Sequence, residues 1–298
     1  MRPPWTPEYE LTPAAAARLI AAQFPALAGQ PLERIGVGWD NDAYRVGDSK
    51  LFRFPRRAIA AVCIANETRW LPDLAPSLPL PVPVPEHIGV PADGYPWPFL
   101  GSRWIEGRTA CSVDLSDADR KAIAAPLARF LRTLHAIPLV AEAPEDPAGR
   151  KDVPTLAAKT LESLGKLPPD FEETAAAVRK VEQLASTAEP SGPDRWVHGD
   201  LYARHLLVDA EKHLCGVIDW GDVHAGDPAD DLSIAFGFLA GEARAAFFGA
   251  YGEVEEATRE RARLYALRVG GVIAGYGRAV GDGALVEAGR TALRFAVE

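Results

Sequence analysis

The sequence has few of the features that mark exported, membrane-spanning or nucleic-acid-binding proteins. Only 3 cysteines occur among 298 residues, far apart and without the Cys-x-x-Cys spacing of a zinc site or redox pair. No apolar run reaches the roughly 18 residues needed to cross a bilayer, and the first residues carry prolines and acids where a signal peptide has an apolar core. Basic residues number 32 against 41 acidic ones, a net charge of -9 that argues against nucleic acid or an anionic membrane as a partner. We therefore expect a cytoplasmic protein with reduced core cysteines.

The first part of the chain alternates between helix and strand patterns. Thr12 followed by Pro13 and an alanine-rich stretch to Gln23 is a helix start, because the hydroxyl can cap free N–H groups and proline suits the first turn. Short apolar runs with glycine turns over residues 32–55 predict antiparallel strands joined by tight hairpins. Residues 58–74 return to the apolar spacing of a helix.

The rest of the chain is mostly helical after a proline-rich connector. Seven prolines between residues 71 and 91 exclude a continuous helix there and favour an extended connector or an edge strand. Residues 98–107 predict one more strand. A capping box at Ser116 and Asp119 then begins a helical region, which a hairpin over residues 205–219 interrupts. The predicted helices cover residues 116–135, 153–164, 171–186, 229–251, 257–280 and 284–296.

Together these patterns predict an α+β protein with two lobes. A length of 298 residues is about twice that of a typical domain, and 48% hydrophobic residues are ample for a core. We expect a small lobe built on an antiparallel sheet in residues 1–106 and a large helical lobe in residues 107–298.

Acidic residues concentrate in one segment between His198 and Asp231. It holds eight acids and two bases, a net charge of -6, and four of the six histidines. Like charges gathered in one region repel one another, so a bound cation would stabilise the segment. The acids are Asp200, Asp209, Glu211, Asp219, Asp222, Asp227, Asp230 and Asp231.

Two of these acids are well placed for chemistry. Asp200 comes before one predicted strand of the hairpin and Asp219 ends the next, so the hairpin can bring both carboxylates to one rim. Carboxylate oxygens suit Mg²⁺, and a fixed carboxylate can accept a proton from an attacking hydroxyl. For Asp227 and Asp231, capping of a helix or turn explains the residue type at least as well as catalysis does.

A series of motifs links this segment to the rest of the chain. They are Gly36-Val37-Gly38-Trp39-Asp40-Asn41, Leu51-Phe52-Arg53-Phe54-Pro55, Asn66-Glu67-Thr68-Arg69-Trp70-Leu71-Pro72, His198-Gly199-Asp200-Leu201, Val217-Ile218-Asp219-Trp220-Gly221 and Asp227-Pro228-Ala229-Asp230-Asp231-Leu232. This combination resembles the aminoglycoside phosphotransferase family of small-molecule kinases, which includes macrolide phosphotransferases. The resemblance implies a protein-kinase-like two-lobed fold that uses ATP or GTP as phosphoryl donor, with Mg²⁺ as cofactor.

The resemblance also implies roles for individual residues. Asp200 would be the catalytic base or orienting carboxylate, and Asp219 a Mg²⁺ ligand. Arg53 stands where the family has a basic residue, often lysine, that holds the nucleotide phosphates, and Glu67 would pair with it. The other implied nucleotide contacts are Gly36 and Gly38, whose backbone N–H groups can approach phosphates, and the hinge of Ser102, Arg103, Trp104 and Ile105, which would read the base.

The histidines of the segment divide into one candidate ligand and three others. His205 stands five residues after Asp200, where the family usually has an asparagine metal ligand. An imidazole can bind a divalent ion, although Mg²⁺ favours oxygen, and some members that act on macrolides also have histidine there. We interpret His198 as a buried histidine that braces the loop, His213 as a surface residue and His224 as a loop residue.

The leading functional hypothesis is phosphoryl transfer to a hydroxyl of a small, sugar-containing and cationic molecule such as an aminoglycoside. Macrolides are the alternative acceptors, together with other hydroxyl compounds such as homoserine or choline. The acidic segment favours a cationic acceptor, but Mg²⁺ requires part of that charge. The sequence carries no signal for the oligomeric state.

Two hypotheses from other classes remain. A metal-dependent hydrolase would be built on His198, Asp200, His205 and Asp219, but the sequence lacks the HxHxDH and HExxH clusters of zinc hydrolases. A catalytically silent nucleotide-binding scaffold is suggested by Arg53 and His205. The presence of both Asp200 and Asp219 argues against that scaffold.

Overall fold

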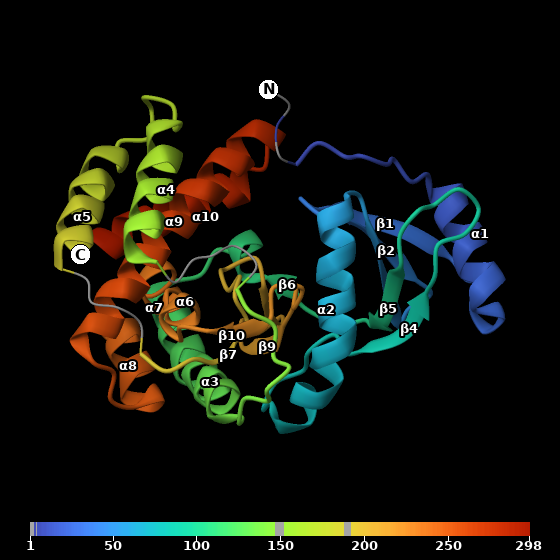
Figure 1. Cartoon of the computed structure of the whole chain (residues 1–298), viewed down its shortest axis with the longest axis horizontal. Helices are drawn as coiled ribbons and strands as arrows, with labels where there is room; N and C mark the ends of the chain where they lie inside the picture. Colours follow the sequence, from blue (N-terminus) through green and yellow to red (C-terminus); the bar gives the residue numbers. More distant parts are fainter. Residues whose placement is uncertain (1–2, 4, 147–151, 188–191) are drawn as a thin grey trace. The chain divides into compact units, whose positions relative to one another are not determined.

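The chain folds into two compact units in the computed structural model, which describes residues 3, 5–146, 152–187 and 192–298 (Figure 1). The N-terminal unit comprises Met1–Pro76, Pro81–Ile105 and Asp219–Asp222. The C-terminal unit comprises Ser77–Leu80, Glu106–Ile218 and Val223–Glu298. The main passage between the units falls at Ile105, and the short segment Asp219–Asp222 returns to the N-terminal unit from far along the chain.

A five-stranded antiparallel sheet forms the centre of the N-terminal unit. Its strands are β1 (Leu32–Val37), β2 (Asn41–Val46), β3 (Lys50–Pro55), β4 (Pro85–Gly89) and β5 (Phe99–Arg103), in the order β1-β2-β3-β5-β4. The proline-containing β4 is an edge strand, where a missing backbone donor costs no ladder bond. The helices are α1 (Pro13–Gln23), whose first turn the Thr12 hydroxyl caps, and α2 (Ala58–Leu74). These elements confirm the predicted small lobe.

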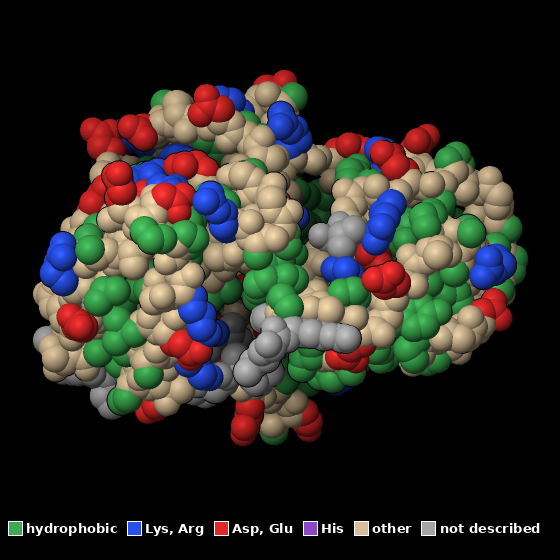
Figure 2. Space-filling model, turned by 90° about the horizontal axis from the view of Figure 1, so that it is seen from above, with side chains coloured by type: hydrophobic (Ala, Val, Ile, Leu, Met, Phe, Trp, Pro, Cys, Tyr) green, Lys and Arg blue, Asp and Glu red, His purple; other side chains and the backbone are tan. Residues whose placement is uncertain are grey.

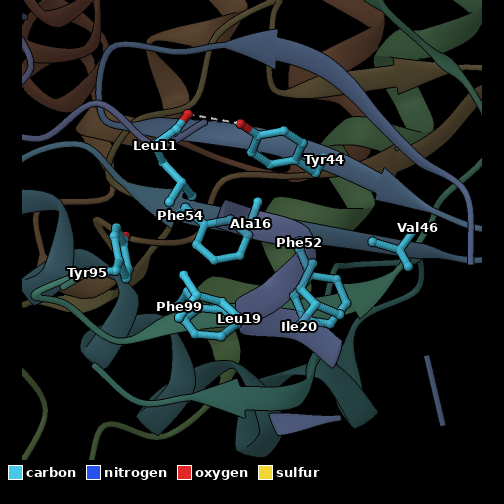
Figure 3. Close-up of a cluster of buried hydrophobic side chains, with 10 residues drawn as sticks. All are labelled: Leu11, Ala16, Leu19, Ile20, Tyr44, Val46, Phe52, Phe54, Tyr95 and Phe99. Atoms are coloured by element: carbon cyan, nitrogen blue, oxygen red, sulfur yellow. Dashed lines mark hydrogen bonds between the residues drawn. The ribbon is translucent and has the colours of Figure 1, made fainter. Parts of the chain in front are cut away.

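The core of the N-terminal unit is rich in aromatic rings (Figure 3). Phe54 stacks on Phe99 with ring centroids 4.4 Å apart, which fixes β3 relative to β5. Gly101 lies so close to Phe52 that an added Cβ would be 2.5 Å from the ring, so only glycine fits at this point of β5. The same strand β3 carries Arg53, whose position therefore depends on this packing.

Helices make up most of the C-terminal unit. They are α3 (Asp117–Ala136), which begins with the predicted Ser116–Asp119 capping box, α4 (Val153–Gly165), α5 (Thr174–Thr187), α6 (Ala229–Leu232), α7 (Ile234–Gly237), α8 (Gly241–Tyr251), α9 (Glu256–Val280) and α10 (Gly283–Val297). Short 3₁₀ helices lie at Pro25–Leu27, Ala75–Ser77 and Ala110–Ser112. Among the residues that the structure describes, no helix is both long and apolar enough to span a bilayer.

Two small sheets lie among these helices. One has the order β6-β8-β9, from β6 (Arg108–Thr109), β8 (Leu206–Val208) and β9 (Leu214–Val217). The other pairs β7 (Arg195–Val197) with β10 (His224–Gly226). The predicted hairpin over residues 205–219 is thus confirmed and gains β6 as a third strand.

Three sequence predictions differ from the structure. The single helix predicted over residues 229–251 is wrong: it is divided into α6, α7 and α8, and the chain between α7 and α8 leaves the helical conformation at Phe238 and Ala240. The helix predicted from residue 171 begins only at Thr174. His224 lies in β10 rather than in a loop, and only 2% of it is exposed.

The three cysteines are free thiols, as expected, but they are half-buried rather than part of the core. Burial raises the pKa of Cys63 to about 12, and the nearby Asp222 and Asp40 carboxylates add to that effect. Because the thiolate is the reactive form, Cys63 is a poor nucleophile at neutral pH.

Candidate active site

The loop between β7 and β8 carries the His198-Gly199-Asp200 motif. His198 is fully buried, and its Nε2–H donates to the carbonyl oxygen of Ile218 at 3.0 Å while its Nδ1 accepts the N–H of Asp200 at 3.3 Å. Gly199 has a φ of 81°, a left-handed conformation that glycine adopts without strain. The bracing role predicted for His198 is therefore confirmed, since it ties the loop to the residue that follows β9.

A second buried residue, Asp231 in α6, binds the backbone of the same loop. Its Oδ2 accepts the N–H of His198 at 2.8 Å and its Oδ1 accepts the N–H of Gly199 at 3.0 Å. The Nε2–H of His135 in α3 also donates to Oδ2, at 3.0 Å, and the His135 Nδ1 lies 2.7 Å from the Tyr251 hydroxyl. Three side chains from α3, α6 and α8 thus form one hydrogen-bonded chain that ends on the loop before Asp200.

The hydrogen bonds of Asp231 to His135 and to the loop depend on the negative charge of its carboxylate. Burial raises the pKa of its carboxyl, but the hydrogen bond and charge of His135 and the interactions with His198 outweigh burial and leave the pKa below its ordinary value. Asp231 is therefore ionised at neutral pH, and its contribution to stability is lost only when the pH falls through that lowered pKa. The sequence left Asp231 open between capping and catalysis, whereas the structure shows a positioning residue.

The loop beyond Asp200 is fixed at several points while the Asp200 side chain remains 41% exposed. His205 is 5% exposed, and its Nδ1 lies 2.6 Å from the Asp200 carbonyl oxygen, so Nδ1–H donates and Nε2 keeps its lone pair. The N–H of Ile218 donates to the His205 carbonyl oxygen at 2.9 Å. Arg204 binds Asp282, the N-cap of α10, at 2.9 Å. The result is an accessible carboxylate on a fixed backbone.

Arg53 lies between two carboxylates within the N-terminal unit. Its Nη2 donates to Glu67 Oε1 on α2, and its Nη1 donates to Asp219 Oδ1 at 3.3 Å. The expected Arg53–Glu67 pair is thus present, with side chains 10% and 1% exposed. Burial alone lowers the pKa of Arg53, but the Glu67 and Asp219 charges outweigh burial and raise it, so the guanidinium keeps its charge.

Asp219 is held in an uncommon backbone conformation. Its φ of 69° is left-handed, which aspartate tolerates better than most residues because its short side chain is polar. The following segment is fixed to α2: the Asn66 side chain donates to the Gly221 carbonyl oxygen at 3.0 Å, and a Cβ at Gly221 would lie 2.8 Å from Cys63. The carboxylate of Asp219 itself is 45% exposed.

Of the predicted phosphate-covering glycines, Gly36 lies near the end of β1 and Gly38 in the turn between β1 and β2. A Cβ at Gly36 would meet no atom within 4 Å, so packing within the chain does not require glycine there. The N–H of Gly38 donates to the Asn41 carbonyl oxygen at 2.9 Å and is therefore used by the turn. Of the two glycines, Gly36 has the open space that close approach of a ligand would need.

The predicted base-reading hinge begins with the last two residues of β5, Ser102 and Arg103, and continues to Ile105. The N–H of Trp104 donates to the Ser49 carbonyl oxygen at 2.8 Å, so this donor belongs to the sheet rather than to a base edge. Ser102 pairs with strands on both sides, and its buried hydroxyl has no hydrogen-bond partner among the described residues. Arg103 is the last residue of β5, and its side chain is 78% exposed. A base-reading role therefore stays a prediction for this segment, without the Trp104 donor.

Comparison with known proteins agrees with this arrangement. The model of the phosphotransferase enzyme family matches residues 31–265. The chain belongs to this family. Among solved structures, the GDP complex of aminoglycoside 2'-phosphotransferase-IIIa is similar with a TM-score of 0.72 and 23% identity over 96% of this chain and 99% of that chain. Macrolide 2'-phosphotransferase type I gives a TM-score of 0.60 and 21% identity over 95% and 97%. The predicted family and fold are confirmed.

A curated relative of this phosphotransferase matches a shorter part. Viomycin phosphotransferase of Streptomyces vinaceus is 42% identical over 64 residues, which are 20% of this chain and 22% of that protein. The match thus spans less than a quarter of the relative, whereas the structural similarity extends over nearly the whole chain.

Several acids of the His198–Asp231 segment of the phosphotransferase serve internal contacts. Asp227 forms a buried ion pair with Arg261 of α9, with 2.6 Å between Oδ2 and Nε. Asp209 accepts the N–H of His213 at the β8–β9 turn, where the His213 side chain is 69% exposed, as predicted. On the face shown in Figure 2, acidic and basic side chains are interspersed. Because Asp227 and Asp209 are used within the chain, they give little support to a cationic acceptor.

The donor atoms fit Mg²⁺ unequally. The carboxylate of Asp219 offers the hard oxygen that Mg²⁺ prefers and is exposed enough to leave room for metal-bound water. His205 can offer only Nε2, a nitrogen, from a nearly buried ring. No group of three or more His, Cys, Asp and Glu side chains is arranged as a metal site within residues 3, 5–146, 152–187 and 192–298. Asp219 is therefore the better candidate ligand of the two.

Proposed function

We propose that this phosphotransferase transfers the γ-phosphoryl group of ATP or GTP to a hydroxyl of a small-molecule antibiotic of the aminoglycoside type. The observation that carries the proposal is the Asp200 carboxylate, which is accessible while the backbone around it is bound by His198 and Asp231. A general base must reach the acceptor and yet hold a fixed orientation, and this loop meets both conditions. Family membership supports the reaction class.

Different residues carry different parts of the reaction in this proposal. Arg53, held by Glu67, binds phosphate oxygens through its permanent charge. Asp219 and His205 are the residues that would hold Mg²⁺, and the ion would supply neutralisation of charge on the phosphates. Asp200 orients the acceptor hydroxyl and accepts its proton.

The acceptor class rests on the similar proteins. One solved neighbour is a GDP and kanamycin complex, another is a macrolide phosphotransferase, and the curated relative is named for viomycin. We propose an aminoglycoside first and a macrolide second, the latter because of His205. The test is to incubate the enzyme with Mg²⁺, ATP or GTP, and each of kanamycin, a macrolide, viomycin, choline and homoserine. Mass spectrometry should show one added phosphate on an antibiotic, and phosphorylation of homoserine or choline alone would reject the proposal.

A metal-dependent hydrolase is disfavoured by the state of His198. Both of its ring nitrogens form hydrogen bonds, one to the backbone of Ile218 and one to that of Asp200, so neither has a lone pair for a metal. A silent scaffold is disfavoured because Asp200 and Asp219 both keep accessible carboxylates.

Asp219→Asn is expected to weaken Mg²⁺-dependent nucleotide binding about tenfold or more, since it removes a charged ligand but keeps the size and left-handed backbone of the residue. Isothermal titration of a non-hydrolysable nucleotide with and without Mg²⁺ measures this effect. Asp222→Asn, in the same returning segment, is the matched control. An equal response to Mg²⁺ in wild type and both variants would show that Asp219 is not a metal ligand.

His205→Asn is expected to increase activity with Mg²⁺ relative to Mn²⁺, because an amide oxygen replaces a nitrogen and Mn²⁺ accepts nitrogen more readily. The ratio of initial rates in the two metals measures the change. His205→Ala should lower the activity measured with Mg²⁺ and the activity measured with Mn²⁺. Identical metal preference in wild type and both variants would make His205 a purely structural residue.

A further inference from the structure

A surface cavity of about 480 Å³ lies in the C-terminal unit beside the hydrogen-bonded chain that ends on the Asp200 loop. Its lining comes from the end of α3, from β7 and from the end of α8, labelled in Figure 1. The polar lining residues are Arg132, His135, Asp194, Arg195 and Tyr251, and the apolar wall is formed by residues 137–139. The volume is that of a site for a small organic molecule.

Among the described residues that line this cavity, positive side chains outnumber negative ones. Arg132 forms no hydrogen bond or ion pair with any residue that the structure describes, and it is exposed. Arg195 has a contact of 3.4 Å between its Nη1 and the Asp194 carbonyl oxygen, and no ion pair within the described residues. Asp194 supplies one negative charge against the two guanidinium groups. Since guanidinium groups bind oxyanions with paired donors, the excess positive charge favours an anionic group.

The position of the cavity connects it to the catalytic loop. Tyr251 and His135 line it, and they also form the chain that reaches Asp231 and the backbone of His198. Asp231 accepts the Nε2–H of His135, and the Nδ1 of the same ring shares a hydrogen bond with the Tyr251 hydroxyl. A ligand that accepts a hydrogen bond from the Tyr251 hydroxyl would draw that hydroxyl away from His135. The loop that carries Asp200 would then be held less firmly.

We propose that this cavity binds a small molecule that carries an oxyanion and an apolar group, and that its occupancy lowers turnover through Tyr251, His135 and Asp231. The binding part depends only on the cavity. The effect on turnover also rests on the proposed function of Asp200.

The test uses phenyl phosphate and benzoate as probes, with inorganic phosphate to measure the contribution of the apolar group. Binding to the full chain is measured calorimetrically while a saturating non-hydrolysable nucleotide occupies the nucleotide site. Arg132→Gln and Arg195→Gln are each expected to weaken probe binding about tenfold or more, the usual effect of a lost charge-assisted hydrogen bond. Arg129→Gln, an exposed arginine one turn earlier in α3, is the matched control and should bind as the wild type does. Absence of probe binding, or equal affinity in all these variants, would overturn the site.

Turnover supplies the second readout. The bound probe is expected to lower kcat about fivefold or more without changing the KM for nucleotide, the size of a usual coupling between two sites. In Tyr251→Phe the probe should still bind but should no longer change kcat. Binding with an unchanged kcat in the wild type would reject the coupling while keeping the site, and lack of turnover with any acceptor would instead refute the proposed function.

Discussion

Asp200→Asn is expected to lower kcat by about 100-fold to 10,000-fold while nucleotide affinity stays within a factor of two or so, because a positioned base contributes to the transferring step and not to phosphate binding. The substitution keeps the size of the side chain and the hydrogen bond between the Asp200 N–H and His198. Single-turnover kinetics with the acceptor found by the panel, together with nucleotide titration, measure the two quantities separately.

A matched control for this variant is Asp209→Asn. Asp209 belongs to the same acidic segment, but its carboxylate binds the turn after β8 and lies outside the proposed chemistry. It should keep wild-type kcat. If Asp200→Asn behaves like Asp209→Asn, the catalytic assignment of Asp200 is wrong.

Asp231→Asn should produce two large effects. Three N–H donors converge on this carboxylate, and an asparagine amide can accept fewer of them while its NH₂ group faces a donor. The free energy of unfolding should fall by about 3–5 kcal/mol, as for other broken buried pairs. The kcat of the folded enzyme should fall by up to about 100-fold, since the loop loses its fixed geometry. Denaturant unfolding and steady-state kinetics at low temperature measure both.

The comparison variant is Asp227→Asn, which breaks the neighbouring buried pair with Arg261. Its loss of stability should be similar, but no loop N–H depends on Asp227, so kcat per folded molecule should stay near the wild-type value. Equal losses of kcat in the two variants would assign Asp231 to stability alone.

Most of the fold could be predicted because it follows from local patterns. The cap of α1 and the capping box of α3 are signals within four residues of sequence, and the structure has both helices. The break of the predicted helix over residues 229–251 has a distant cause. The Arg120 guanidinium, from α3, donates to the Phe238 carbonyl oxygen at 3.0 Å, and Arg244 donates to the Leu239 carbonyl oxygen. Both contacts stabilise a non-helical backbone, and the one from Arg120 could not be seen in any local window of the sequence.

The candidate site divides in the same way. The Arg53–Glu67 pair was predictable from the family motifs. The bracing by His198 was predictable from the position of this histidine next to a glycine in the loop. The chain from Tyr251 through His135 to Asp231 was not predicted, because its members come from three helices. One signal was available: His135 follows Leu131 by four residues, on the buried face of α3, where a histidine needs a polar partner.

The returning segment Asp219–Asp222 has a consequence for chimaeric enzymes made by recombining related genes. The N-terminal unit is not contiguous in the gene, since its Arg53 and Asn66 contact residues that are encoded more than 150 positions later. A crossover at Ile105 therefore gives the N-terminal unit a returning segment from the other parent, and Cys63 then faces a residue that did not evolve beside it. A chimaera with intact units needs two further crossovers around residues 219–222 and two around residues 77–80.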